Sequence, residues 1–175
     1  MNHEELDHEE LNQEAILDLF YANKGNLDKI NAILDARLQN TRTRKITLFE
    51  KYIQARLQLN SKVLKMVNLD VSPLEVLYLT QYPGLRDLEI LDLRKNGFGD
   101  EGLDAIAHAP MLKNLRELDL RNNLITRRGV VSFSQSKTLR ELEKLDLRCN
   151  KLGKSWEQKL KDSGNFPKLM DLKTA

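Results

Sequence analysis

One hexapeptide occurs three times in this chain at a constant 27-residue interval, and no other feature restricts the fold as strongly. The copies begin at Leu88, Leu115 and Leu142, and each has leucine at its first, fourth and sixth positions. Each copy continues into Arg-x-Asn, and a partial fourth copy begins one further period on, at Leu169. A fixed period of this length indicates a solenoid in which every repeat contributes one strand and one helix.

The pattern L-x-x-L-x-L-x-x-N in these copies resembles the leucine-rich repeat family. The segments Gly99–Leu103 and Thr126–Val130 resemble the ribonuclease-inhibitor-like subtype of that family, and the resemblance covers residues 64–175. It implies an α/β fold with parallel strands on a concave face and α-helices on a convex face. It also implies a binding scaffold, without identifying what is bound.

Residues 1–60 do not repeat, and apolar residues at helical spacing predict three helices there, with a turn at 40–43. Asn26 is expected to cap the second helix. We therefore expect an all-helical N-terminal cap over residues 1–60 and a leucine-rich repeat domain over 61–175, with repeats starting near 64, 88, 115 and 142 and a partial repeat at 169. A solenoid needs a cap because its first repeat otherwise exposes an apolar face to water.

The first repeat is expected to be irregular and shorter than the others, over residues 64–87. Leu64–Leu69 is predicted to form its strand, with Ser72 in the place of the repeat asparagine. Ser72 and Glu75 form a capping box around Pro73, which predicts a helix start. Further outer helices are predicted near 101–109, 127–135 and 154–162, with Asp100 and Thr126 opening the first two.

Strand alternation predicts which side chains lie on the concave face. The leucines of each copy point inward, and the residues between them point outward. The expected partner-binding residues are Met66, Asn68, Ile90, Asp92, Arg94, Glu117, Asp119, Arg121, Lys144, Asp146 and Arg148. Met66 and Ile90 would form an exposed apolar pair on adjacent strands, which favours a contact patch.

The aspartates of this set stand in file beside the arginines. Adjacent strands lie about 4.8 Å apart, so the aspartates would repel one another unless the arginines neutralised them. The charges therefore form either an internal lattice of ion pairs or the main contacts to a partner. The asparagines Asn96, Asn123 and Asn150 are expected to bond backbone groups of neighbouring repeats, a structural role.

The sequence offers little for catalysis. His3 and His8 lie in an acidic leader and His108 on an outer helix, and the single cysteine, Cys149, has no predicted base beside it. Metal-ligand spacing and a glycine-rich phosphate loop are both absent from the sequence, so neither a cofactor nor a metal is expected. We predict that the protein is not an enzyme.

Charge and hydropathy restrict the partners. The net charge of +2 is too balanced for general nucleic-acid binding, so nucleic acid is not an expected partner. No apolar run approaches the length of about 20 residues that a membrane-spanning helix needs, so a membrane is not expected either. With one cysteine and no recognisable secretory signal at the N-terminus, a cytoplasmic location is expected.

The predicted function is a non-enzymatic protein-interaction module that binds a protein partner through the concave sheet. The alternative is a regulatory or architectural subunit of a larger assembly that acts through the N-terminal helical region, where positions 1–20 hold seven acids and no base. The partial copy at Leu169 also predicts a strand with an unpaired outer edge, and hence a homodimer joined through that edge.

Overall fold

The computed structural model describes the whole chain except residues 1–17, 20, 25, 40–45, 153–155 and 175. It divides into two compact units, Met1–Ser61 and Lys62–Ala175. The acidic leader, the turn at 40–43 and the start of the predicted helix at 154–162 lie outside the described residues. None of the helices that the structure describes is long and apolar enough to cross a membrane.

The first unit contains the helices α2 (Leu27–Gln39) and α3 (Ile46–Leu59), which pack together. Asn26 caps α2 as predicted, since its side chain accepts the amide of Lys29 at 3.1 Å. The two helices are joined by a polar cluster in which the Asp35 carboxylate accepts from the Tyr52 hydroxyl at 2.5 Å and from the Arg56 guanidinium at 2.7 Å. Arg56 is only 5% exposed, so this pairing holds its charge within the packed unit.

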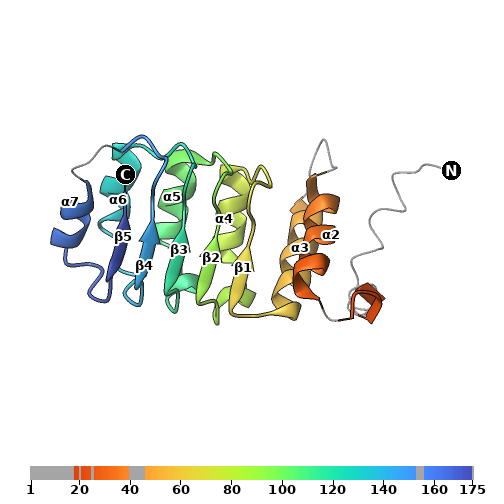
Figure 1. Ribbon diagram of the computed structural model, residues 1–175. Coiled ribbons are helices and arrows are strands. Elements are labelled where there is room, and N and C mark those ends of the chain that lie inside the picture. Colours follow the sequence, from red (N-terminus) through yellow and green to blue (C-terminus); the bar gives the residue numbers. More distant parts are fainter. Residues whose placement is uncertain (1–17, 20, 25, 40–45, 153–155, 175) are drawn as a thin grey trace. The chain divides into compact units, whose positions relative to one another are not determined.

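The second unit is a five-stranded parallel sheet whose strands follow chain order, with helices behind it (Figure 1). The strands are β1 (Val63–Lys65), β2 (Ile90–Asp92), β3 (Glu117–Asp119), β4 (Lys144–Asp146) and β5 (Asp171–Lys173). The helices are α4 (Pro73–Gln81), α5 (Gly99–Ala107), α6 (Arg127–Phe133) and α7 (Trp156–Asp162), with short 3-10 turns η1 (Pro83–Leu85) and η2 (Pro110–Leu112). This is the predicted leucine-rich repeat solenoid, which confirms the expected fold class.

The core of the second unit lies between the sheet and the helices. The leucines of each hexapeptide are buried, and so are the equivalent helix positions Ile106, Phe133 and Leu160. Phe133 and Phe166 stack with their ring centroids 5.1 Å apart, which extends this core towards β5.

The predicted asparagine ladder is confirmed. The Asn123 side chain is fully buried; its oxygen accepts the amides of Asn96 and Gly97, each at 2.9 Å, and its nitrogen donates to the carbonyls of Leu93 and Leu120. These bonds join each turn to the next and satisfy backbone groups that the short strands leave unpaired.

The first repeat differs from the prediction. Val63 pairs with Ile90 and Leu64 with Leu91, so this repeat has the same 27-residue spacing as the others. Leu69, rather than Ser72, stands at the asparagine position, because its amide donates to the Asn96 side chain. Leu64 therefore corresponds to the second leucine of the hexapeptide, not the first.

The helix starts confirm two predictions and correct a third. Ser72 and Glu75 form the complete capping box of α4, and Thr126 caps α6 by accepting the amide of Arg128. Asp100 does not cap α5; Phe98 holds the cap position without a side-chain bond. The Asp100 carboxylate instead accepts both the amide and the hydroxyl of Thr126, each at 2.7 Å, and so connects two successive repeats.

Candidate functional site

The concave face of the sheet carries three rows of side chains, which the strand register defines. The variable row is Val63, Ile90, Glu117, Lys144 and Asp171, with one residue from each strand. The aspartate row, two positions further along each strand, is Lys65, Asp92, Asp119, Asp146 and Lys173. The arginine row, two positions further again, is Arg94, Arg121 and Arg148.

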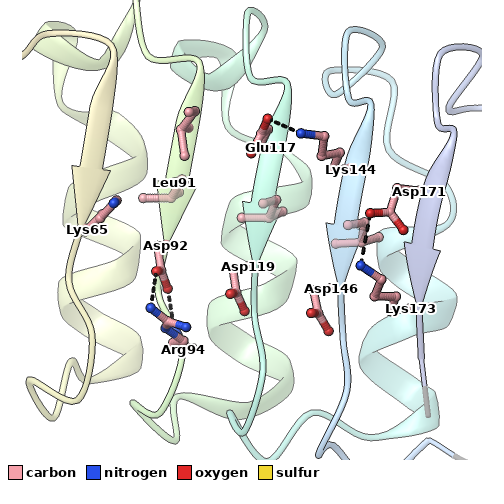
Figure 2. A pocket seen from close by; sticks show the side chains of 13 residues that line it. Lys65, Leu91, Asp92, Arg94, Glu117, Asp119, Lys144, Asp146, Asp171 and Lys173 are labelled. Atoms are coloured by element: carbon pink, nitrogen blue, oxygen red, sulfur yellow. Dashed lines mark hydrogen bonds and ion pairs between the residues drawn. The ribbon is translucent and has the colours of Figure 1, made fainter.

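A shallow cavity of about 350 Å³ lies over these rows and is lined by residues from all five strands. Figure 2 shows Asp92, Asp119 and Asp146 in file across the three central strands, with Lys65 at one side and Lys173 at the other. The short strands keep this surface narrow, and their alternation turns every second side chain towards the cavity.

The structure corrects two of the predicted site residues. Met66 is fully buried, because the register places it beside Leu93 as an inward-facing residue. Asn68 lies in the turn after β1 with a positive φ of 57°, equivalent to Lys95 with a φ of 62°, and so does not stand beside Asp92. The other nine predicted residues lie in the three rows.

Sequence reasoning misses four residues of these rows: Val63, Lys65, Asp171 and Lys173. Val63 and Lys65 are missed because Leu64 resembles the first leucine of a hexapeptide, although the repeat begins three positions earlier. A 27-residue step back from Leu88 reaches Ser61, and this spacing is the signal that finds them. Val63 takes the place predicted for Met66 as the apolar neighbour of Ile90, and both are half-buried.

Two arginines of the arginine row are held firmly by the aspartate row. Arg121 donates from Nε and Nη2 to Asp119, with the shortest distance 2.7 Å, and its Nε also lies 3.5 Å from the Asp146 carboxylate. Arg148 makes the same bidentate contact with Asp146, donating from Nε at 3.0 Å and from Nη2 at 2.6 Å. The predicted lattice of ion pairs is therefore present, and paired contacts of this kind are the stronger sort.

Arg94 is held differently. Its Nη2 lies 3.2 Å from the Asp92 carboxylate, and its Nε is buried without a hydrogen-bond partner among the described residues. Its side chain is 37% exposed. Arg94 therefore keeps unused hydrogen-bonding capacity that the other two arginines have committed to their aspartates.

The pKa of Asp92 and the pKa of Asp146 are shifted in opposite directions, because the two carboxylates are bound differently by their arginines. Burial raises the pKa of Asp92, which is 7% exposed, and the negative charge of Asp119 adds to this, so that the attraction of Arg94 does not compensate. Burial also acts on Asp146, but the hydrogen bonds that it accepts from Arg148 outweigh it and lower its pKa.

The variable row changes character across the sheet. Val63 and Ile90 are apolar, whereas Lys144 donates to Glu117 at 2.7 Å, and Asp171 accepts from Lys173 of the aspartate row at 3.1 Å. The contact with Glu117 raises the pKa of Lys144, which keeps this exposed amine charged. The variable row is thus apolar over β1 and β2 and charged over β3 to β5, and Ile90 is its apolar member that lines the cavity.

One cluster on the outer helices resembles catalytic machinery by composition but not by geometry. The Ser132 hydroxyl donates to the Asp104 carboxylate, and the His108 Nδ1 lies 3.5 Å from the same carboxylate. A serine nucleophile needs its hydroxyl bonded to the imidazole, with the carboxylate on the far side. Here the carboxylate stands between the two, so the imidazole is not placed to take the proton.

Cys149 is exposed at the tip of a turn. No group of three or more histidine, cysteine or acidic side chains suited to a metal ion occurs in the part of the chain that the structure describes.

Comparison with known proteins agrees with this geometry. A family model described as a leucine-rich repeat matches residues 84–107 and 112–134. Among solved structures, one titled "Leiomodin-1 Actin-Binding Site 2 (ABS2)" is similar over 64% of this chain and 69% of that chain, with a TM-score of 0.52 and 19% sequence identity. A search of curated proteins gives no significant match.

The chain therefore has a leucine-rich repeat fold, and two of its repeats match the leucine-rich repeat model. Folds of this class typically act in protein–protein interaction without catalysis.

Proposed function

We propose that this protein is a non-enzymatic interaction module that binds a protein partner through the concave sheet. The observation that carries the proposal is the variable row, where residue type changes from strand to strand above a shallow cavity, while the leucines and asparagines beneath it repeat. Packing and turn formation require the constant positions, but they do not require the variable row. A row without structural duties is where specificity for a partner can reside.

The size of the surface supports a protein partner. Five strands about 4.8 Å apart give a sheet roughly 20 Å wide, which a standard interface of about 800 Å² per partner would cover completely. The structural neighbour is titled an actin-binding site. At 19% identity that likeness concerns the fold, so the partner proposed here is a protein without further specification.

We further assign the repeats to the ribonuclease-inhibitor-like subtype. The assignment rests on the full α-helices that follow β2, β3 and β4 and on the glycines Gly102 and Gly129 at equivalent buried helix positions.

The double substitution Ile90→Asp with Lys144→Glu tests the concave site. It changes two side chains of the variable row that face the cavity and leaves the buried leucines untouched. We expect capture of protein partners from a cell extract to be lost, while the circular dichroism spectrum and the melting temperature are retained.

The matched control is Val131→Asp with Arg128→Glu, which makes the same kinds of change at exposed positions of α6 on the outer face. This variant should capture the same proteins as the unaltered chain. Equal capture by all three proteins would show that the concave sheet is not the binding surface.

The alternative function is that of a regulatory or architectural subunit acting through the N-terminal helical region. It is favoured by the separate compactness of the first unit and by the polar cluster of Asp35, Tyr52 and Arg56 that joins its two described helices. Loss of capture on removal of residues 1–60, together with full capture by the Ile90→Asp and Lys144→Glu variant, would favour this alternative.

We also propose that two molecules can join through β5. Within this chain β5 pairs with β4 on one side, and Met170 beside it is 78% exposed. A strand with one unpaired side can accept a strand from another molecule.

A further inference from the structure

In the arginine row, Arg94 differs from Arg121 and Arg148 because its guanidinium makes no bidentate hydrogen bonds to an aspartate of the sheet. Arg121 and Arg148 each make two-pronged hydrogen bonds to the aspartate two positions earlier. Arg94 makes one longer ion pair, and its buried Nε lacks a hydrogen-bond partner among the described residues. An unpaired buried donor is unfavourable, so a conformation that supplied it with an acceptor would be stabilised.

The neighbouring strand adds to the difference between Arg94 and Arg121. Arg121 also approaches Asp146 of the next strand, at 3.5 Å, which fixes its guanidinium between two carboxylates. Arg94 has no such second carboxylate within the described part of the chain, and Asp92 itself is withdrawn to 7% exposure. The guanidinium of Arg94, with 37% of its side chain exposed, is therefore the cation in this row that can still take a carboxylate from outside.

An apolar pair lies beside this cation. Ile90 begins β2, four positions before Arg94, which lies in the turn after that strand, and Val63 is the register partner of Ile90 on β1. Ile90 and Asp92 are alternate residues of β2. Figure 2 shows Arg94 beside Asp92, with Lys65 next to Asp92 on the adjacent strand. The β1–β2 side of the concave face thus offers an apolar contact and a cation, and Ile90 and Arg94 both line the cavity.

We propose that the β1–β2 side of the concave face binds an extended protein segment that presents an apolar side chain to Val63 and Ile90 and a carboxylate to Arg94. This inference rests on the proposed function and specifies its partner as an acidic, partly apolar segment. The incoming Asp or Glu replaces the weak contact with Asp92 by a two-pronged one. The guanidinium turns to meet it, and Nε gains an acceptor.

The geometry of extended chains restricts the spacing of the two groups. Side chains two or four positions apart lie on the same face of an extended segment and are about 7 or 13 Å apart, as they are along β2 itself. Side chains three positions apart lie on opposite faces. The proposed partner therefore has its apolar and acidic residues at even spacing.

The charges beside Arg94 favour a carboxylate over a nucleic-acid backbone. Asp92 and Asp119 stand in the same row, and a chain of phosphates crossing the sheet would pass over all three aspartates. A single carboxylate at Arg94 avoids most of that repulsion, since Arg121 and Arg148 neutralise the other two.

The probe is a synthetic peptide, acetyl-Gly-Leu-Ser-Ser-Ser-Glu-Gly-amide, in which Leu and Glu have the same four-residue spacing as Ile90 and Arg94, titrated into the full chain at pH 7. Arginine Nε–H signals in a ¹⁵N-edited NMR spectrum report the site directly, and the Arg94→Lys variant identifies the Arg94 signal. We expect the peptide to shift the Arg94 Nε–H signal together with backbone signals of β1 and β2. The same peptide with Gln for Glu, and one with Leu and Glu three positions apart, should give little shift.

Two matched variants provide the control. Arg94→Gln should weaken peptide binding by about tenfold, the usual consequence of losing a charged hydrogen-bonding partner. Arg121→Gln, one strand away in the same row, should weaken it by less than about twofold, because that guanidinium is already occupied. Both variants keep the backbone bonds of their turns.

Several results would overturn the inference. An equal response to the Glu and Gln peptides, or an equal loss in the two arginine variants, would exclude Arg94 as a carboxylate site. A shift confined to β3 to β5 would place peptide binding elsewhere on the sheet and leave the proposed function standing. No shift with any peptide would remove this inference alone, because the capture experiment with Ile90→Asp and Lys144→Glu tests the concave surface independently. A response to a single-stranded oligonucleotide but to no peptide would point to nucleic acid instead.

Discussion

Asp92 and Asp146 occupy the same position of their repeats, yet their charges are balanced differently. Both carboxylates accept the backbone amide of the arginine two positions later. Asp146 also accepts two hydrogen bonds from the Arg148 side chain, whereas Asp92 is more deeply buried and has one longer ion pair with the Arg94 side chain. Repetition of the sequence therefore does not repeat the electrostatics, because each aspartate also responds to its neighbours in the file.

Replacing each aspartate by asparagine should reveal this difference as a function of pH. At pH 7 Asp146→Asn should lower the free energy of unfolding by about 1 kcal/mol, the net contribution of a typical hydrogen bond, because the Asp146–Arg148 pair is partly exposed to water. Asp92→Asn should cost less, because burial already disfavours the charged form that it removes. Urea unfolding at a series of pH values measures both.

The direction in which stability changes with pH follows from the pKa shifts of Asp146 and Asp92. The pKa of Asp146 is lowered in the folded state, so its contribution is present above the unfolded pKa, near 4, and is lost as the pH falls through the folded value. The pKa of Asp92 is raised, so folding gains from its protonation as the pH falls from above the folded value towards 4. The two variants should converge in stability at low pH. A constant gap between them at every pH would contradict this account.

The file of aspartates beside arginines could be predicted from the sequence because the 27-residue period fixes which positions become neighbours. The weak contact between Asp92 and Arg94 could not be predicted from the sequence. It depends on the burial of Asp92 and on how far other described carboxylates lie from Arg94, which are distances between side chains rather than properties of a repeat.

Successive helices are locked together by a contact that crosses the repeat boundary. The Asp100 carboxylate accepts both polar hydrogens of Thr126, and a Cβ added to Gly129 would lie 2.4 Å from the Asp100 Oδ1. Gly129 therefore leaves room for an interaction between α5 and α6 that the cap of α6 depends on.

We expect Gly129→Ala to lower the free energy of unfolding by about 1–3 kcal/mol, the usual cost of overpacking a close contact. The methyl group would displace the Asp100 carboxylate and loosen both of its bonds to Thr126. Chemical denaturation followed by circular dichroism measures the change.

The double variant with Asp100→Ala provides the control. Gly129→Ala should cost less in that background than in the unaltered chain, because the clashing oxygens are gone. Equal costs in the two backgrounds would show that the carboxylate is not what the glycine accommodates.

At the scale of elements the sequence predicts the regular repeats well and the first repeat poorly. The hexapeptide places β2, β3 and β4 correctly because each contains its three leucines. In the first repeat, Leu64 and Leu69 have the same spacing as the first and last leucines of the hexapeptide. In the register, however, Leu64 is equivalent to the second leucine, Met66 to the last leucine and Leu69 to the repeat asparagine. Apolar spacing alone cannot distinguish two registers that both bury apolar residues, whereas the asparagine bonds between turns can.

The two compact units raise the question of whether the repeats fold without the N-terminal helices. A solenoid's first repeat has an apolar face that needs cover, so we expect the fragment 61–175 to aggregate or to lose cooperative unfolding. Size-exclusion chromatography and a thermal melt of this fragment are the measurements. A soluble fragment that melts in one sharp transition would show that residues 1–60 are not a cap.

The proposed joint through β5 can be tested at the exposed Met170. Its amide already donates to the Glu143 carbonyl at 2.9 Å, so the side chain is the part to change. Met170→Glu should reduce any self-association by placing like charges at the edge of the two strands. Light scattering over a concentration series measures the mass. A protein that is monomeric at every concentration, or a dimer unaffected by the substitution, would rule out this joint.

The register of the sheet advances by one repeat period at every strand from β1 to β5. A deletion or duplication of one full period would therefore rejoin strands in the correct alignment; without residues 67–93, for example, Val63 would stand beside Glu117. Each such event would remove or add one column of the concave surface and leave the remaining columns intact. A gene of this kind can change the length of its binding surface by recombination between its own repeats, with no need to redesign the fold.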